Sequence, residues 1–390
     1  MSREGVIIQV KTDDGYVGIG EAAPLPGLSP EPLKKALHQI KSLRQKLIGL
    51  NIESFPPRVM SSPRKRGSQS RGKLQRESTF WIPALRQAQD VLRLAQDRSK
   101  DREQRRTSSK SGERSRTTFA GMTEGLVSSV RFGIEMAVLH AVAQSKKSPL
   151  AEILGCAHIK DVATAGLLQG TLEEIKRQAE RLVSHGHEVF KLKVGNKNIP
   201  LDVKKVEVVR AVIGPRRALR LDANRTWGLK EAVAFGQNIG REGIEFMEEP
   251  LNDLSDLAAF VRATKLPVAL DESLHDLDPR KASSLNGVEF LVIKPTIMGG
   301  LIKTLDWIAE AARVKKNVVI SSSFESSIGM TALANLATFT AYAAGLGTSG
   351  WLKEDLMHAP LIGPNGAILK KSLQFGVEDI KMEHLIKIKE

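Results

Sequence analysis

Short apolar runs recur through the second half of the chain, and each of them leads into a charged residue. Five such runs follow one another, and their charged ends lie 23 to 29 residues apart. Each interval has the length of one strand plus a returning helix, which predicts parallel strands. The runs are rich in Val, Ile and Leu with little polar alternation, as is typical of a sheet buried on both faces. They cover residues 190–193, 219–224, 244–250, 268–273 and 290–295.

The alternation of strand and helix extends in both directions. Residues 164–168 predict a first strand, residues 318–321 a seventh, and a short strand near residues 350–352 would nearly close the sheet. Thr171 and Glu174 have the spacing of a capping box, which predicts a helix that ends near Gly186. We therefore predict an α/β fold with a βα barrel at residues 156–355.

The N-terminal part of the chain has a different pattern. Residues 6–10 and 16–20 predict a hairpin of two strands, and apolar stripes predict two amphipathic helices at residues 33–48 and 127–141. These elements predict an α+β capping domain, which is formed by residues 1–58 and 120–155. We expect the C-terminal segment, residues 356–390, to return to this domain.

The segment between the two helices, residues 59–119, differs from the rest of the chain. Between Arg58 and Phe119 there are 17 Lys or Arg against 6 Asp or Glu, a net charge of +11 out of +14 for the whole chain. This low-complexity composition, rich in Ser, Arg and Gln, predicts a disordered insertion, apart from a short helix at residues 82–94. A tether that binds RNA is the alternative, but few aromatic residues, Phe80 and Trp81, lie between the basic ones.

The remaining composition narrows the class of protein. The single cysteine, Cys156, excludes a disulfide framework and fits a reducing compartment. No run of about 18 apolar residues predicts a membrane span, and the first residues lack the apolar core of a signal peptide. We expect a cytoplasmic enzyme that acts on a small carboxylate, with neither a membrane nor a nucleic acid as its partner. The sequence does not predict an oligomeric state.

The charged ends of the strands predict chemistry. In a βα barrel the C-terminal ends of the strands meet on one face, where catalysis takes place. Three acids end successive strands, and Lys193 and Lys294 end the strands on either side. Carboxylate oxygens suit Mg²⁺, with Mn²⁺ as an alternative, and a lysine beside such a cation can take a proton from a carbon next to a carboxylate. Loop caps or salt bridges are the alternative for any single acid. The predicted metal ligands are Asp222, Glu248 and Asp271.

This set of motifs resembles the enolase superfamily, in particular its muconate-lactonising-like branch. Residues 191–193, Lys-Leu-Lys, are similar to the KxK motif of the second barrel strand. The three acids match the family's metal ligands, and Lys294 matches the opposing lysine on the sixth strand. Residues 18–27 resemble the loop of the capping domain that closes over substrate. The resemblance implies a modified (β/α)7β TIM-type barrel with an α+β capping domain.

The serine-rich residues 321–329 are similar to the seventh-strand segment of o-succinylbenzoate synthases. That resemblance implies the loss of water from a hydroxycyclohexadiene carboxylate (SHCHC), which gives o-succinylbenzoate for menaquinone synthesis. It implies that Lys193 removes the proton and then protonates the departing hydroxide, that Lys294 acts as a cation, and that Lys191 helps to neutralise the carboxylate. The implied substrate contacts are Leu25, Pro26, Asn224, Gly299, Ser321, Ser322 and Ser323.

Two rival functions stay open at this point. A dipeptide epimerase or N-succinylamino acid racemase would use the same two lysines on opposite faces of a stereocentre. Nucleic-acid binding through the basic insertion is a more distant alternative. Members of the resembling family usually begin with a further strand and a mobile loop before the equivalent of Arg3, which predicts an N-terminally short capping domain here.

Overall fold

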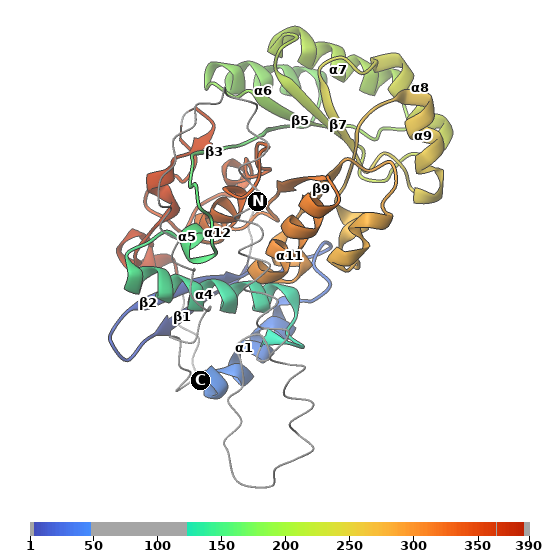
Figure 1. Ribbon diagram of the computed structural model, residues 1–390. Coiled ribbons are helices and arrows are strands. Elements are labelled where there is room, and N and C mark those ends of the chain that lie inside the picture. The colour runs from blue at the N-terminus through green and yellow to red at the C-terminus, as the bar shows by residue number, and fades with distance from the viewer. Residues whose placement is uncertain (1–3, 48–122, 364, 386–390) are drawn as a thin grey trace, which may run out of the picture.

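The computed structural model describes residues 4–47, 123–363 and 365–385 of the chain. The predicted insertion at 59–119, with its short helix at 82–94, lies outside these residues. The N-terminal unit consists of the antiparallel pair β1 (Val6–Lys11) and β2 (Val17–Ala22), the helix α1 (Leu33–Leu47) and the helix α4 (Ser128–Lys146). Figure 1 shows this unit packed against one side of the strand barrel.

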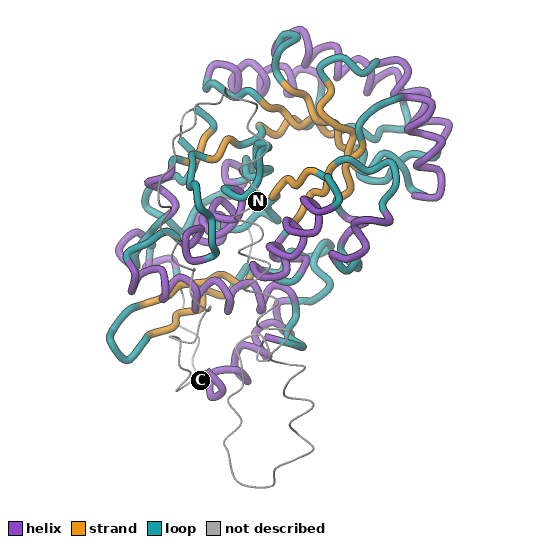
Figure 2. The backbone as a smooth tube through the Cα atoms, in the orientation of Figure 1, coloured by secondary structure: helices purple, strands orange, loops and turns teal. Residues whose placement is uncertain are grey.

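The second unit is a parallel sheet that curls upon itself, with helices on its outer face (Figure 2). This confirms the predicted α/β TIM-type barrel. Its strands lie side by side in chain order: β4 (Gly166–Leu168), β5 (Val189–Lys193), β6 (Ala218–Asp222), β7 (Ile244–Glu248), β8 (Val268–Leu270), β9 (Phe290–Ile293) and β10 (Asn317–Ile320).

Helices return the chain between the strands, and the connection from β8 to β9 is made by two 3-10 helices, Glu272–Leu274 and Pro279–Ser284. The predicted capping box is present, because Thr171 and Glu174 each bond the backbone N–H of the other at the start of α6. The barrel helices are α6 (Leu172–Ser184), α7 (Ile199–Ile213), α8 (Leu229–Ile239), α9 (Leu257–Thr264), α10 (Pro295–Met298), α11 (Gly300–Arg313) and α12 (Ser327–Ala337). In the described part of the chain, none of the helices combines the length and the hydropathy that a membrane span needs.

The barrel closes in a different place from the one predicted. Residues near 350–352 form no strand; Ser349–Trp351 is a short 3-10 turn. The gap between β10 and β4 is bridged earlier, where Ala344 pairs with Thr164 and Gly345 pairs with Ser321. Closure at this point depends on backbone hydrogen bonds made by two small residues. The sequence did not predict them, because they do not belong to an apolar run of the kind that indicates a strand.

The helix α4 is not amphipathic as predicted, since 14 of its 19 residues are buried. One side of it packs against β2 and the other against the barrel helices α10 and α11. The contact with β2 is very close. A Cβ atom added to Gly20 would lie 1.9 Å from the carbonyl oxygen of Gly133, and one added to Gly18 would lie 1.9 Å from that of Ala137. Glycine is therefore required at both strand positions.

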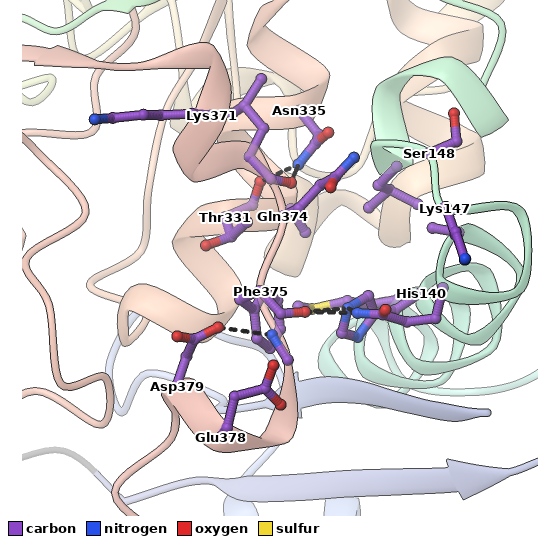
Figure 3. A pocket seen from close by; sticks show the side chains of 17 residues that line it. His140, Lys147, Ser148, Thr331, Asn335, Lys371, Gln374, Phe375, Glu378 and Asp379 are labelled. Atoms are coloured by element: carbon purple, nitrogen blue, oxygen red, sulfur yellow. Dashed lines mark hydrogen bonds between the residues drawn. The ribbon is translucent and has the colours of Figure 1, made fainter. Parts of the chain in front are cut away.

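The C-terminal segment crosses α4 and α12 and is held by polar side chains. His140 stacks on Phe375 with 4.4 Å between ring centroids, and the amide of Asn335 donates to the carbonyl of Leu373 at 2.9 Å. A cavity of about 350 Å³ lies between the two helices and this segment (Figure 3). The remaining elements are α5 (Leu150–Ile153) and the antiparallel pair β3 (Val162–Ala163) and β11 (Ala367–Ile368). The predicted domain boundaries stay a prediction.

Candidate active site

The barrel strands bring the predicted catalytic and metal residues to one end of the sheet. Asp222, at the end of β6, is paired with Lys193 of β5 on one side and with Glu248 of β7 on the other. Asp271 directly follows β8, and Lys294 directly follows β9. Because the strands lie in chain order, the three acid-bearing strands separate the two lysine-bearing ones.

The two lysines of β5 both contact the acids. The ammonium of Lys191 lies between two carboxylates, at 2.8 Å from Asp222 Oδ2 and 2.7 Å from Glu248 Oε1. The ammonium of Lys193 lies 2.6 Å from the same oxygen of Asp222 and donates to Asn224 Oδ1 at 2.9 Å. Asn224, predicted as a substrate contact, is therefore a neighbour of the predicted base.

Burial and charge act against each other at these acids, which are each no more than 1% exposed. Burial would raise the pKa of Asp222, but Lys191 and Lys193 outweigh it and hold that pKa at about 2. Burial and the neighbouring Asp222 raise the pKa of Glu248 to about 8, although Lys191 opposes them. Negative charge is therefore crowded at the end of β7.

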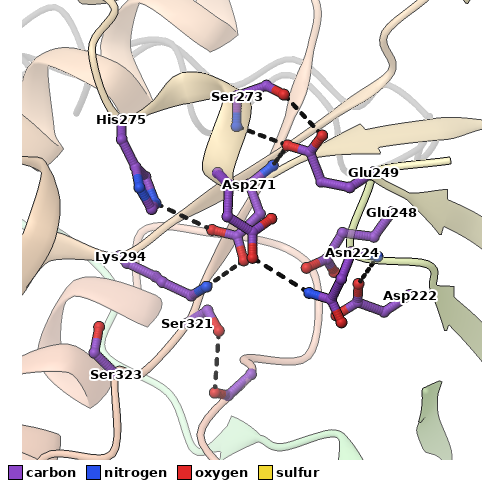
Figure 4. Close-up of polar contacts among 12 residues, drawn as sticks. Asp222, Asn224, Glu248, Glu249, Asp271, Ser273, His275, Lys294, Ser321 and Ser323 are labelled. Atoms are coloured by element: carbon purple, nitrogen blue, oxygen red, sulfur yellow. Dashed lines mark hydrogen bonds and ion pairs between the residues drawn. The ribbon is translucent and has the colours of Figure 1, made fainter. Parts of the chain in front are cut away.

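A similar pair lies at the other end of the row (Figure 4). Lys294 donates to Asp271 Oδ2, and His275 Nε2 lies 3.5 Å from Asp271 Oδ1. Burial would raise the pKa of Asp271, but the positive charge of Lys294 holds it well below its usual range. Burial would lower the pKa of Lys294, but Asp271 and Glu272 raise it above its usual range.

The donor set fits a hard divalent cation by its chemistry. All three predicted ligands are carboxylates, which supply the oxygen atoms that Mg²⁺ prefers. Asp271 Oδ1 is buried, and its long contact of 3.5 Å with His275 Nε2 is weak enough to leave this oxygen available to a cation. Within the described residues, however, no three Asp, Glu, His or Cys side chains are grouped closely enough to hold an ion.

The serine segment follows β10, next to the strand of Lys294. Figure 4 shows Ser321 and Ser323 near Lys294. The hydroxyl of Ser321 donates to the carbonyl of Gly345 at 3.4 Å, and the hydroxyls of Ser322 and Thr348 lie 2.6 Å apart. The structure therefore places the serines beside the site, and their contact with substrate stays a prediction.

The other predicted substrate contacts come from two loops. Gly299 ends α10 with a φ of 108°, in the left-handed region. Leu25 and Pro26 lie in the turn after β2. Four residues before Leu25, the buried carboxylate of Glu21 accepts hydrogen bonds from Ser326 and Gly329 at the start of α12. This contact holds the base of the loop against the barrel near the serine segment.

Several polar residues of the site were not predicted. Glu249 accepts a hydrogen bond from the N–H of Asp271. Glu325 accepts one from the hydroxyl of Thr296 and another, at 2.6 Å, from the N–H of Ser323. The Glu-Glu-Pro sequence at 248–250 offered a signal for Glu249, because two adjacent acids at the end of a strand cannot both face the same way. The sequence offered no comparable signal for His275.

The family model for the enolase C-terminal domain-like family matches residues 174–372, just over half of the chain. The chain therefore belongs to this family. Its similarity to o-succinylbenzoate synthases makes it an o-succinylbenzoate synthase-like member of the enolase superfamily.

Individual relatives support this assignment. The chain is 36% identical to the o-succinylbenzoate synthase of Salmonella paratyphi B over 203 residues, 51% of this chain and 62% of that protein. It is 34% identical to the chloroplastic protein PHYLLO of Arabidopsis thaliana over 261 residues, 59% of this chain and 15% of that protein. The chain thus spans less than two thirds of these curated relatives. A dipeptide epimerase from Enterococcus faecalis V583 has the same fold, with a TM-score of 0.70, 22% identity, and coverage of 94% of this chain and 91% of that one.

Proposed function

We propose that the chain is a lyase that dehydrates SHCHC to o-succinylbenzoate, with Mg²⁺ as its cofactor and a lysine as its base. The observation that carries the proposal is the arrangement of Lys193 and Lys294 at opposite ends of a row of three buried carboxylates. The similarity in sequence to o-succinylbenzoate synthases and the serine-rich segment beside Lys294 favour this substrate among those of the superfamily.

In its neutral amine form, Lys193 uses its lone pair to take the proton from the ring carbon that carries the carboxylate. Its contacts with Asp222 Oδ2 at 2.6 Å and Asn224 Oδ1 at 2.9 Å hold the nitrogen at a defined position. The electron pair of the broken C–H bond becomes a ring double bond as hydroxide leaves the neighbouring carbon. Lys193 then returns the proton to this hydroxide, so that water and an aromatic ring are formed.

The other residues supply positive charge. Mg²⁺ held by Asp222, Glu248 and Asp271 would offset the charge of the substrate carboxylate as the proton leaves. Lys191 lies between two of these acids, which raise its pKa although burial opposes them, and it adds a cation beneath the substrate. Lys294, paired with Asp271, presents a second cation to the opposite face of the ring.

The alternative is an epimerase or racemase that acts on dipeptides or N-succinylamino acids. In that reaction one lysine removes the α-proton and the other delivers a proton to the opposite face. The likeness of fold to dipeptide epimerases keeps this function open, although at 22% identity it shows the fold alone. Both reactions need Lys193, but only racemisation needs Lys294 to exchange a proton.

The first experiment compares the full chain, Lys193→Ala and Lys197→Ala, with Mg²⁺ present and SHCHC as substrate. Loss of the base should lower kcat by about 10²–10⁴-fold. Lys197 is an exposed lysine on the following loop, so its replacement should leave kcat unchanged. An undiminished kcat in Lys193→Ala would show that another group is the base, and faster racemisation of an N-succinylamino acid than dehydration of SHCHC would establish the alternative.

A second variant separates the two reactions. Lys294→Arg keeps a positive charge, but a guanidinium stays protonated and cannot exchange the proton that racemisation requires. If Lys294 acts as a cation only, dehydration should survive in part in this variant while any racemisation is abolished. Equal loss of both activities would contradict the cation role.

A further inference from the structure

Glu249 follows the predicted ligand Glu248 and is fully buried, yet the proposed reaction gives it no role. Its backbone has a φ of 45°, a left-handed conformation that is costly for a residue other than glycine and that persists only where the surroundings hold it. Two backbone hydrogen bonds do so. The N–H of Glu249 donates to Ala269 at 3.0 Å, and its carbonyl accepts from Arg225 at 2.9 Å.

The side chain of Glu249 is directed at the turn that follows β8 (Figure 4). Its Oε1 accepts from the N–H of Asp271 and from the N–H of Ser273, both at 2.8 Å. Its Oε2 accepts from the hydroxyl of Ser273, also at 2.8 Å. All three donors belong to the short turn on which Asp271 is carried.

These contacts join Glu249 to each of the three predicted metal ligands. Glu248 directly precedes Glu249 in the chain. The side chain of Glu249 accepts a hydrogen bond from the peptide N–H of Asp271, and the carbonyl of Glu249 accepts one from Arg225 in the loop that follows Asp222. We propose that Glu249 is a positioning residue that sets the relative placement of these carboxylates for a divalent cation. The inference rests on the proposed function, because it assumes that the three acids bind Mg²⁺.

The arrangement of donors argues against Glu249 as a further ligand. Each of its oxygens already accepts from an N–H or O–H group of the turn, so neither is directed at a cation. Groups that orient a metal's ligands through hydrogen bonds in this way have a measurable effect on metal affinity although they never touch the metal.

The test is isothermal titration of the full chain with Mg²⁺ alone. Glu249→Ala should bind Mg²⁺ about 10–100-fold more weakly than the parent chain. Glu249→Gln should bind nearly as well as the parent, because its amide oxygen accepts both backbone N–H groups while its amide nitrogen donates to the hydroxyl of Ser273. Ser273→Ala, which removes the hydroxyl donor only, should have an intermediate effect.

Asp355 offers a matched control. Its carboxylate also accepts from two backbone N–H groups, those of Ser327 at 2.9 Å and Leu356 at 2.7 Å, and from the hydroxyl of Ser327, but it holds no predicted ligand. Asp355→Ala should therefore leave Mg²⁺ affinity unchanged. Circular dichroism at the titration temperature establishes that each variant is folded. If Glu249→Ala does not fold, the Mg²⁺ affinities of Ser273→Ala and Glu249→Gln test the positioning role instead.

The outcomes separate the inference from the function on which it rests. If Glu249→Ala binds Mg²⁺ as the parent does, or if Glu249→Gln is weakened as much as Glu249→Ala, the positioning role is wrong and the proposed function stands. Should Glu249→Ala not fold, parent-like binding by Ser273→Ala or weak binding by Glu249→Gln overturns the role. If the parent chain binds no Mg²⁺, both proposals fail.

Discussion

Buried acids occur in two regions of the molecule, and their surroundings differ. At the ends of the barrel strands, carboxylates stand next to one another and to three lysines. At the boundary between the N-terminal unit and the barrel, Glu21 and Glu135 accept hydrogen bonds from backbone N–H groups of α12 and α11, and Glu135 also pairs with Arg131 at 2.8 Å. Buried acids thus lie beside lysines at the strand ends, whereas at the boundary they accept hydrogen bonds from the backbone of helices in the barrel unit.

The difference has an energetic meaning. At the strand ends the effects oppose one another, because burial and the neighbouring Asp222 raise the pKa of Glu248 to about 8, whereas Lys191 and Lys193 hold the pKa of Asp222 at about 2. At the boundary, the carboxylate of Glu21 accepts from the N–H and the hydroxyl of Ser326 and from the N–H of Gly329, so that each bond adds to the contact. We expect changes at the boundary to alter stability more than changes at the strand ends do.

The strongest test of this comparison is Glu21→Ala. The substitution leaves the donors of Ser326 and Gly329 without their acceptor at a buried contact, which should lower the free energy of unfolding by about 3 kcal/mol. Urea denaturation followed by circular dichroism measures the change. Glu124→Ala, at an exposed position of the same unit, is the control and should leave stability as it is. An equal stability of both variants would remove the distinction between the two regions.

The contrast also explains what the sequence could predict. The strands and the charged residues at their ends follow from local patterns, and the structure places those residues at one end of the sheet. The bonds of Glu21 and Glu249 depend on segments that are distant in sequence, so no local pattern indicated them. The burial of α4 on nearly all sides was missed because the helix is covered by two different units. The closing pair at residues 344–345 is defined by hydrogen bonds rather than by apolar side chains.

A smaller effect is expected at Asp306, near the boundary. Burial raises its pKa from 3.8 to about 6, against the opposing charge of Arg131. The folded chain therefore holds this proton more tightly than the unfolded chain, and the resulting stability, present below about pH 4, is lost as the pH rises through 6. Asp306→Asn should raise the free energy of unfolding by roughly 1–3 kcal/mol at pH 8 and leave it unchanged near pH 4.

Urea denaturation at the two pH values measures this difference. Asp13→Asn, in the exposed turn of the hairpin, is the control and should show no dependence of this kind. A gain in stability that is the same at both pH values would mean that the neutral amide acts through packing rather than through the removed charge.

The smallest effect is expected at the start of α7, in the loop that follows β5. The side chain of Asn198 accepts from the N–H of Leu201 and caps this helix. Asn198→Ala should cost about 1 kcal/mol, and Asn198→Ser should restore most of it, because serine also caps helices well. Thermal unfolding compares the two variants. If Asn198→Ala lowered the free energy of unfolding as much as Glu21→Ala does, the hydrogen bonds at the boundary would contribute no more to stability than an ordinary helix cap.

The joint that closes the barrel at Gly345 determines where the hydroxyl of Ser321 lies. A side chain there would bring its first carbon to 2.7 Å from the hydroxyl oxygen of Ser321. That hydroxyl would have to move away from its contact with the carbonyl of Gly345. The absence of a side chain on one α-carbon in the barrel wall thus lets the strands join without displacing a serine that the proposed function puts next to the substrate.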